Sequence, residues 1–176
     1  MATGAPLGFD PIAEAARQWE AHGWAAAAPG MAMVTSVARV NQILLAQADG
    51  LLAPHDLTFA RYELLALLQF SRQGELPLGK IGRRLQVHPA SVTNAVDRLE
   101  QQGFVRRVAH PTDGRAVLAR ITPAGRRVAK RATAALNEAL FEAVPLTTDE
   151  LGQLFSLLRR VRLDAADFTD GSDPPG

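Results

Sequence analysis

Hydrogen-bonding side chains follow one another at helical spacing in the middle of the chain, between a proline and a glycine. They are Ser91, Thr93, Asn94 and Arg98, and the residue His88 stands just before them. Side chains of these types can donate and accept the hydrogen bonds that base edges and phosphates offer in a DNA major groove. A merely solvated helix face has the same composition, so the elements around this segment must decide between the two interpretations.

The surrounding pattern predicts a helix, a turn and a second helix. Apolar residues at i, i+3 and i+7 mark a short helix over 78–85, and 86–88 makes the turn. Pro89 suits the first position of a helix, because its missing N–H costs nothing there, and Gly103 suits the position after the end. The core-facing side of this second helix would carry Val92, Ala95, Val96 and Leu99.

A β-hairpin is predicted directly after the second helix. Two β-rich runs, 104–109 and 116–121, flank a Pro/Asp/Gly turn cluster, and 76–78 adds a short third strand. Such a hairpin is too small to be stable alone and must lean on the helices before it. Its tip carries Arg115, which would enter the adjacent minor groove, with Asp113 placed to pair with it and aim it. Together these elements predict a winged helix-turn-helix.

These segments resemble the multiple antibiotic resistance regulator (MarR) family of bacterial transcription factors, over most of the chain. The resemblance rests on Asp113-Gly114-Arg115, on the preceding helix end 97–103 and on the following 118–125. It implies that the helix over 89–102 is the recognition helix and that Arg115 is the minor-groove residue. The expected DNA-binding residues are therefore His88, Ser91, Thr93, Asn94, Arg98, Asp113 and Arg115.

The composition is that of a mostly helical protein of one ordinary domain, with 176 residues, 47% of them hydrophobic and 6% aromatic. The expected fold class is mainly α with a small β wing. The absence of cysteine excludes disulfides, thiolate metal sites and thiol redox switches. The N-terminal residues lack a secretion pattern and no apolar run reaches membrane length, so we expect a cytoplasmic protein without membrane contact.

The residue patterns in the sequence do not indicate an enzyme or a metal-binding protein. The four histidines, His22, His55, His88 and His110, include no pair at a metal-ligand spacing. Ser91, His88 and Asp97 do not make a hydrolytic site, because nothing suggests an oxyanion hole, and no glycine-rich loop could cradle a phosphate. We therefore expect neither an enzyme nor a cofactor.

The charge is unevenly distributed, although its formal net value is only +1. Residues 98–131 hold nine Lys and Arg against two Asp and Glu, a net of +7, whereas residues 1–57 carry −3. The basic segment coincides with the predicted reading helix and wing. That coincidence is typical of a surface that binds phosphates.

Helices flank the winged helix-turn-helix on both sides. Asp10 and Pro11 would start a first helix, a break is expected over 25–30, and a longer helix with a nearly heptad stripe follows over 31–52. A central buried helix is expected over 58–71, a long one from Pro123 to the residue before Pro145, and a last one behind a capping box of Thr147 and Glu150.

The apolar stripes on the outer helices exceed what a DNA-binding core of this size can cover. The predicted organisation is a single domain of dimerisation helices over 10–52 and 123–166 around a winged helix-turn-helix over 58–121, with a disordered tail over 167–176. The resemblance implies the same: a twofold homodimer that binds a palindromic operator.

The extra N-terminal helix is similar to that of the family's subgroup that responds to urate or to anions such as aconitate. The resemblance implies a ligand pocket lined by Trp19, Glu63 and Arg107. Glu63 stands where the subgroup commonly has aspartate, which favours an aconitate- or citrate-like effector over urate. The expected function is a ligand-responsive regulator, a repressor that a small anionic metabolite releases from DNA.

The sequence also allows other roles for these three residues and another function for the protein. Arg107 would equally bind phosphate, Glu63 would equally form an internal ion pair, and Trp19 would equally belong to the core. The alternative function is a winged-helix protein that binds DNA without ligand control or that binds another protein. Arg115 favours the DNA-binding interpretation over the protein-binding one, because a protein-interaction module does not need an arginine that points into a minor groove.

Overall fold

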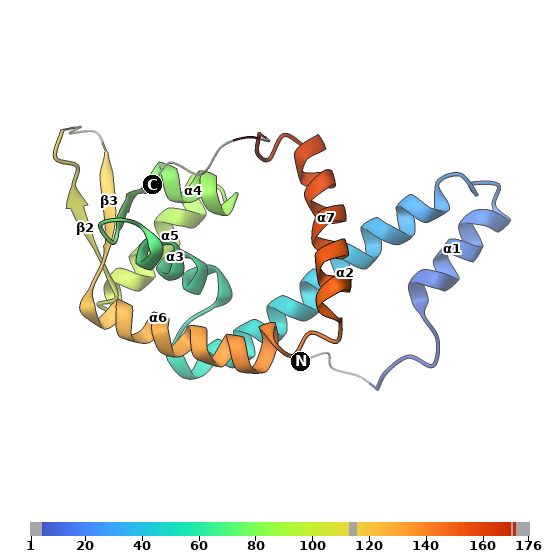
Figure 1. Cartoon of the computed structure of the whole chain (residues 1–176), viewed down its shortest axis with the longest axis horizontal. Coiled ribbons are helices and arrows are strands. Elements are labelled where there is room, and N and C mark those ends of the chain that lie inside the picture. The colour runs from blue at the N-terminus through green and yellow to red at the C-terminus, as the bar shows by residue number, and fades with distance from the viewer. Residues whose placement is uncertain (1–4, 113–115, 170, 172–176) are drawn as a thin grey trace. The chain divides into compact units, whose positions relative to one another are not determined.

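The computed structural model describes residues 5–112, 116–169 and 171 (Figure 1). Within these residues the chain forms seven α-helices and one small antiparallel sheet of three strands. The mainly helical fold class with a small β wing is confirmed. The chain divides into two compact units, one ending at Glu63 and the other starting at Leu64.

The first unit contains α1 (Pro11–Ala21), which packs against α2 (Ala28–Leu52). The predicted cap of α1 is confirmed, because Asp10 Oδ1 accepts a hydrogen bond from the backbone N–H of Ile12 at 2.9 Å. A 3-10 turn, Ala53–His55, follows α2 and leads to α3 (Phe59–Phe70), whose first N–H donates to the Asp49 carboxylate at 2.7 Å.

The predicted break over 25–30 is only partly right, because the chain is non-helical between Ala21 and Ala28 but α2 already starts at Ala28. Pro29 lies in the first turn of this helix. The first four N–H groups of a helix have no partner within the helix, so a proline costs nothing at that place. Pro29 and Gly30 therefore belong to the helix.

The second unit contains the helix-turn-helix and its wing. A short strand β1 (Glu75–Pro77) precedes α4 (Leu78–Leu85) and α5 (Pro89–Gln101), and the hairpin of β2 (Val105–Ala109) and β3 (Val117–Ile121) follows. The sheet order is β1-β3-β2, all antiparallel, so the predicted third strand is confirmed. Asp113 and Arg115, predicted for the wing tip, lie outside the described residues.

The helix after the wing, α6 (Pro123–Leu136), starts at Thr122, whose Oγ1 accepts from the N–H of Gly125 at 3.0 Å. It does not run unbroken to Pro145 as predicted. A π-helical turn, Asn137–Phe141, follows it, with Leu140 buried. A π turn takes one more residue than an α turn, which changes the direction of the side chains after it.

The last helix, α7 (Thr148–Asp164), has the predicted capping box: Thr147 Oγ1 accepts from the N–H of Glu150, and the Glu150 carboxylate accepts from the N–H of Thr147. Residues 170 and 172–176 of the predicted disordered tail lie outside the described part. Among the described residues, no helix has both the length and the apolar character of a membrane span.

The prediction that α3 is buried nearly all round is only partly right. Leu64, Leu65 and Leu68 are buried, but Phe70 at its end is 78% exposed. The remaining core of the second unit comes from α4, α5, the sheet and α6; its largest fully buried side chains are Ile81, Val96, Leu99, Val105 and Leu136.

Candidate nucleic-acid interface

One side of α5 is buried and the opposite side is exposed. The buried side carries Val92, Val96 and Leu99, each at most 2% exposed. Complete burial of such a side chain is worth about 1.5–3 kcal/mol, so this side fixes the rotation of α5 about its own axis. The exposed side then presents to solvent Ser91, Thr93, Asn94 and Arg98.

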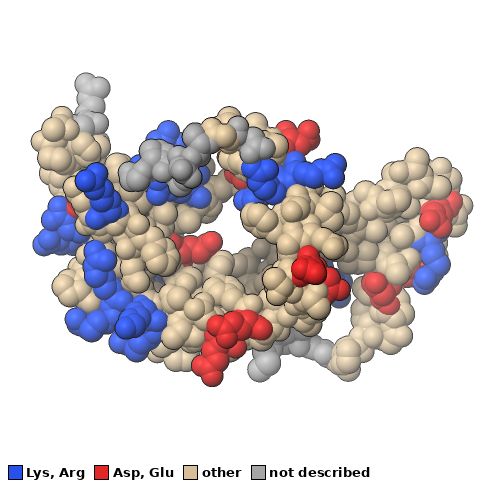
Figure 2. Space-filling view, in the orientation of Figure 1, with Lys and Arg blue, Asp and Glu red and all other residues tan. Residues whose placement is uncertain are grey.

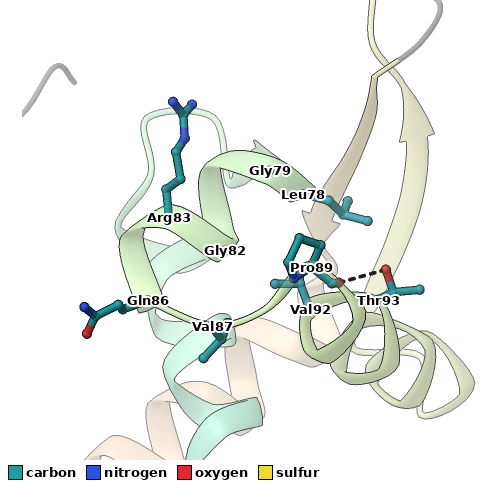
Figure 3. Close-up of a pocket in the computed structure, with 9 residues that line it drawn as sticks. All are labelled: Leu78, Gly79, Gly82, Arg83, Gln86, Val87, Pro89, Val92 and Thr93. Carbon is teal, nitrogen blue, oxygen red and sulfur yellow. Dashed lines mark hydrogen bonds between the residues drawn. The ribbon is translucent and has the colours of Figure 1, made fainter. Parts of the chain in front are cut away.

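The start of α5 is held by two of the predicted DNA-binding residues. His88 is the N-cap, and its Nδ1 accepts a hydrogen bond from the N–H of Ala90 at 3.2 Å. Thr93 Oγ1 donates to the carbonyl of Pro89 at 3.1 Å, as Figure 3 shows. The hydroxyl oxygen of Thr93 can still accept a hydrogen bond, whereas the Nδ1 lone pair of His88 is already used within the protein.

A groove of about 430 Å³ lies between α4 and the start of α5 (Figure 3). Gly82 allows this close approach: a Cβ there would lie 3.3 Å from both the Val87 carbonyl oxygen and Val92 Cγ2. The chain turns between the helices at Gln86, which has a left-handed backbone with φ 52°. Arg83 and Gln86, at the end of α4, are also lining residues, and Figure 3 shows their side chains pointing away from α5.

The guanidinium of Arg107, on β2, is bound to two carboxylates of α5. Nη2 lies 2.6 Å from Asp97 Oδ1, and Nη1 lies 2.5 Å from Glu100 Oε2. The backbone N–H of Arg107 also donates to Glu100 Oε1 at 2.8 Å. Glu100 thus accepts from both the backbone and the side chain of one residue, and these hydrogen bonds lower the pKa of its carboxyl. We call the three residues the Arg107 clamp, because they join the wing strand to the reading helix.

Basic side chains gather around the same elements. Figure 2 shows them over the hairpin and the first half of α6. This part of the chain carries Arg106 on β2, Arg120 on β3, and Arg126, Arg127, Lys130 and Arg131 on α6. Arg120 is ion-paired with Glu75 of β1, so it also ties two strands of the sheet together.

The three residues expected for a ligand site have distinct surroundings. Trp19 of α1 packs edge-on against Trp24, with ring centroids 5.5 Å apart. Glu63 on α3 is half-buried, and burial raises the pKa of its carboxyl. Arg107 belongs to the clamp described above, in the second unit.

Sequence reasoning missed the clamp and the polar groups of α4. Asp97 and Arg107 are ten residues apart, and nothing in their spacing shows that a strand returns along α5. The predicted hairpin gave a partial indication, because a hairpin too small to be stable alone must pack against the helices before it.

Comparison with known proteins supports the DNA-binding assignment. A family model described as MarR family matches residues 57–117. Sco5413, a MarR family transcriptional regulator from Streptomyces coelicolor, is 48% identical in its crystal structure, which covers 81% of this chain and 99% of its own with a TM-score of 0.73. A cysteine-to-serine mutant of MarR from E. coli, crystallised in complex with operator DNA, is 26% identical and covers 73% of this chain and 92% of its own with a TM-score of 0.68.

A shorter similarity links the chain to an HTH-type transcriptional regulator of Mycobacterium leprae. The two are 36% identical over 80 residues, which is 46% of this chain and 56% of that protein. The chain therefore matches only about half the length of this relative. All three relatives are transcriptional regulators, in agreement with the expectation of a protein that is not an enzyme.

Proposed function

This chain belongs to the MarR family of DNA-binding transcriptional regulators, and from that premise we propose that it is a homodimeric repressor of a palindromic operator, released by a small organic anion. The observation that carries the proposal is the exposed polar side of α5, fixed in rotation by its buried apolar side and joined to the wing by Arg107. A rigid helix with this pattern of donors and acceptors suits direct reading of base edges.

The DNA-binding part is tested by a gel shift with the intergenic sequence upstream of the protein's own gene. We expect a shift that unlabelled specific DNA abolishes and unrelated DNA does not. Asn94→Ala and Arg98→Ala should each weaken it about tenfold, in line with roughly 1–3 kcal/mol for a good base contact. If neither variant changes affinity or sequence preference, α5 is not the reading helix.

The proposed role of Arg115 is tested in the same assay. Arg115→Ala should weaken operator binding tenfold or more, as expected for a lost minor-groove contact. An unchanged affinity would remove the wing tip from the mechanism and would favour a protein-interaction role for the winged helix.

The proposal of a homodimer is supported by exposed apolar side chains on two helices. α2 exposes Val34, Val37, Val40 and Ile43, and α7 exposes Leu154, Phe155, Leu157 and Val161, each by 44–60%. Monomeric proteins rarely expose contiguous apolar surface of this kind. A twofold dimer would present two copies of α5 to successive major grooves, which is why we expect the operator to be palindromic.

The proposed effector is an anion resembling aconitate, citrate or urate, and its proposed contacts are Trp19, Glu63 and Arg107. An aromatic wall and a guanidinium suit a planar or carboxylate anion. In this proposal the anion competes with Asp97 and Glu100 for Arg107, loosens the wing from α5 and so lowers DNA affinity. A preference of about 1–3 kcal/mol for the loosened state is typical of such coupling.

The effector is tested by repeating the gel shift with aconitate, citrate, urate and salicylate. We expect one anion to release the DNA and Trp19→Phe to blunt that response while DNA binding remains. A specific shift that none of the anions affects would keep the DNA-binding function and leave Trp19, Glu63 and Arg107 with structural roles only.

A further inference from the structure

A second cavity, of about 640 Å³, lies in the second unit on another side of α4 from the groove beside α5. Its walls are the end of α3, the loop after it, β1, α4 and the start of the wing turn. We call it the basic cavity, because the charged side chains that line it are Arg72, Lys80, Arg84 and Glu75, with His110 beside them.

The only acid among these lining residues does not face the cavity as a free charge. Glu75 is ion-paired with Arg120, and its side chain is 13% exposed. Lys80 and Arg84 lie four residues apart and so share one side of α4, while Arg72 comes from the loop across the cavity. Basic side chains from two separate elements thus line the cavity, which favours an anionic ligand.

Apart from Ser71 and Gln73, the rest of the lining is apolar, and it includes an aromatic side chain that is exposed to solvent. Phe70 is 78% exposed, and Leu76 and Leu118 form a buried floor. Proteins that bind single-stranded nucleic acid combine cationic grooves with aromatic side chains, because the cations bind the phosphate and the ring packs against the unpaired base. A free nucleotide offers the same two groups, whereas a duplex offers the phosphate and the sugar. The volume also lies in the range of small-ligand pockets.

We propose that the basic cavity binds a nucleotide phosphate, with Lys80 and Arg72 at the phosphate and Phe70 against the sugar or base. Two sources could supply this chemistry: a nucleotide of the duplex beside the site read by α5, or a free mononucleotide. The first source rests on the proposed DNA-binding function, and the second does not.

The duplex source is tested through the salt dependence of binding by the full-length protein. Each phosphate contact contributes about 0.9 to the slope of log K against log salt. Lys80→Gln and Arg72→Gln should each reduce the magnitude of that slope between 50 and 200 mM KCl, and together by about 0.9, because both cations bind one phosphate. Lys80→Arg should keep the wild-type slope. Arg160→Gln, on exposed α7, removes the same charge and should leave the slope unchanged.

The free-nucleotide source is tested by calorimetric titration with AMP. We expect binding that Lys80→Gln and Phe70→Ala each weaken at least tenfold. Circular dichroism melts of all variants separate these effects from loss of folding. An altered slope supports the duplex source, and loss of AMP binding supports the free nucleotide.

The proposal is overturned if the cavity variants keep the wild-type slope and the wild-type protein does not bind AMP. If the wild-type protein binds no operator, the proposed function fails, and the AMP titration alone then decides whether the cavity takes a nucleotide.

Discussion

At the residue scale, the Arg107 clamp adds a structural role to two simpler interpretations of one arginine. A basic residue in a DNA-binding wing suggests a phosphate contact, and the family resemblance suggests a ligand contact. The guanidinium instead lies within 2.6 Å of carboxylate oxygens from both Asp97 and Glu100. Its first role is therefore to position β2 on α5, and any DNA or ligand contact must share the same group.

The clamp predicts a pH dependence of folding stability. Hydrogen bonds from Arg107 lower the pKa of Glu100 below its ordinary value of 4.5 in the folded state. A carboxyl with a lowered folded pKa contributes stability above its ordinary pKa and loses that contribution as the pH falls through the folded pKa. Urea unfolding should show Glu100→Gln less stable than wild type at pH 7, with the difference shrinking below pH 4.5. A difference that stays constant with pH would contradict this role.

Gly125 is a second residue whose identity is set by its surroundings. A Cβ there would overlap the carbonyl oxygen of Phe104 and lie 2.9 Å from Ile121 Cγ1. Because backbone blocks the space, Gly125→Ala should destabilise the fold by about 1–3 kcal/mol, as overpacking does.

The matched control is Gly152→Ala on α7, where nothing lies within 4 Å of the added Cβ. Alanine is the better helix former, so this variant should be more stable by about 0.5–1 kcal/mol. Thermal unfolding of both variants checks the pair, and equal melting temperatures would show that α6 moves freely away from the wing.

At the element scale, α5 depends on an unusual cap. Ser, Thr, Asp and Asn usually cap helix N-termini, whereas here the acceptor is His88 Nδ1. His88→Ala should cost about 0.5–2 kcal/mol of stability, and His88→Asn should retain most of it because asparagine also caps. Operator affinity should follow stability, as measured by melts and gel shifts. Equal loss of affinity in both variants at unchanged stability would mean that His88 contacts DNA directly.

Elements governed by local chemistry could be predicted from the sequence. Asp10, Thr122 and Thr147 are helix caps in the structure because their side chains satisfy the N–H groups that the helix leaves unpaired. The break at Pro29 was wrong because proline forbids a helix interior but not a first turn. The π turn after Leu136 had no local signal, because it depends on what packs around Leu140.

The site was predictable to a similar extent. The exposed and buried sides of α5 follow from helical periodicity, so the exposure of Ser91, Asn94 and Arg98 could be predicted. The clamp and the basic cavity depend on which residues the hairpin and the loop before β1 bring to α5 and α4. Such neighbours are set by tertiary packing, which no single segment encodes.

At the scale of the whole molecule, the proposed homodimer would bury exposed apolar side chains of α2 and α7. A glutamate at the centre of a buried apolar contact leaves an unpaired charge, which is costly. Leu154→Glu on α7 should therefore convert a dimer into monomers in sedimentation velocity. It should also weaken binding to a palindromic duplex far more than binding to a half-site, since one monomer carries one reading helix.

The control for this prediction places the same charge elsewhere on α7. Ser156 is exposed and lies on the side of α7 opposite the stripe of Leu151, Leu154 and Leu158, so Ser156→Glu should leave both assembly and DNA binding unchanged. If Leu154→Glu also sediments as wild type, α7 is not part of the dimer contact. A wild-type protein that is monomeric yet binds a full operator would instead separate DNA reading from dimerisation in this chain.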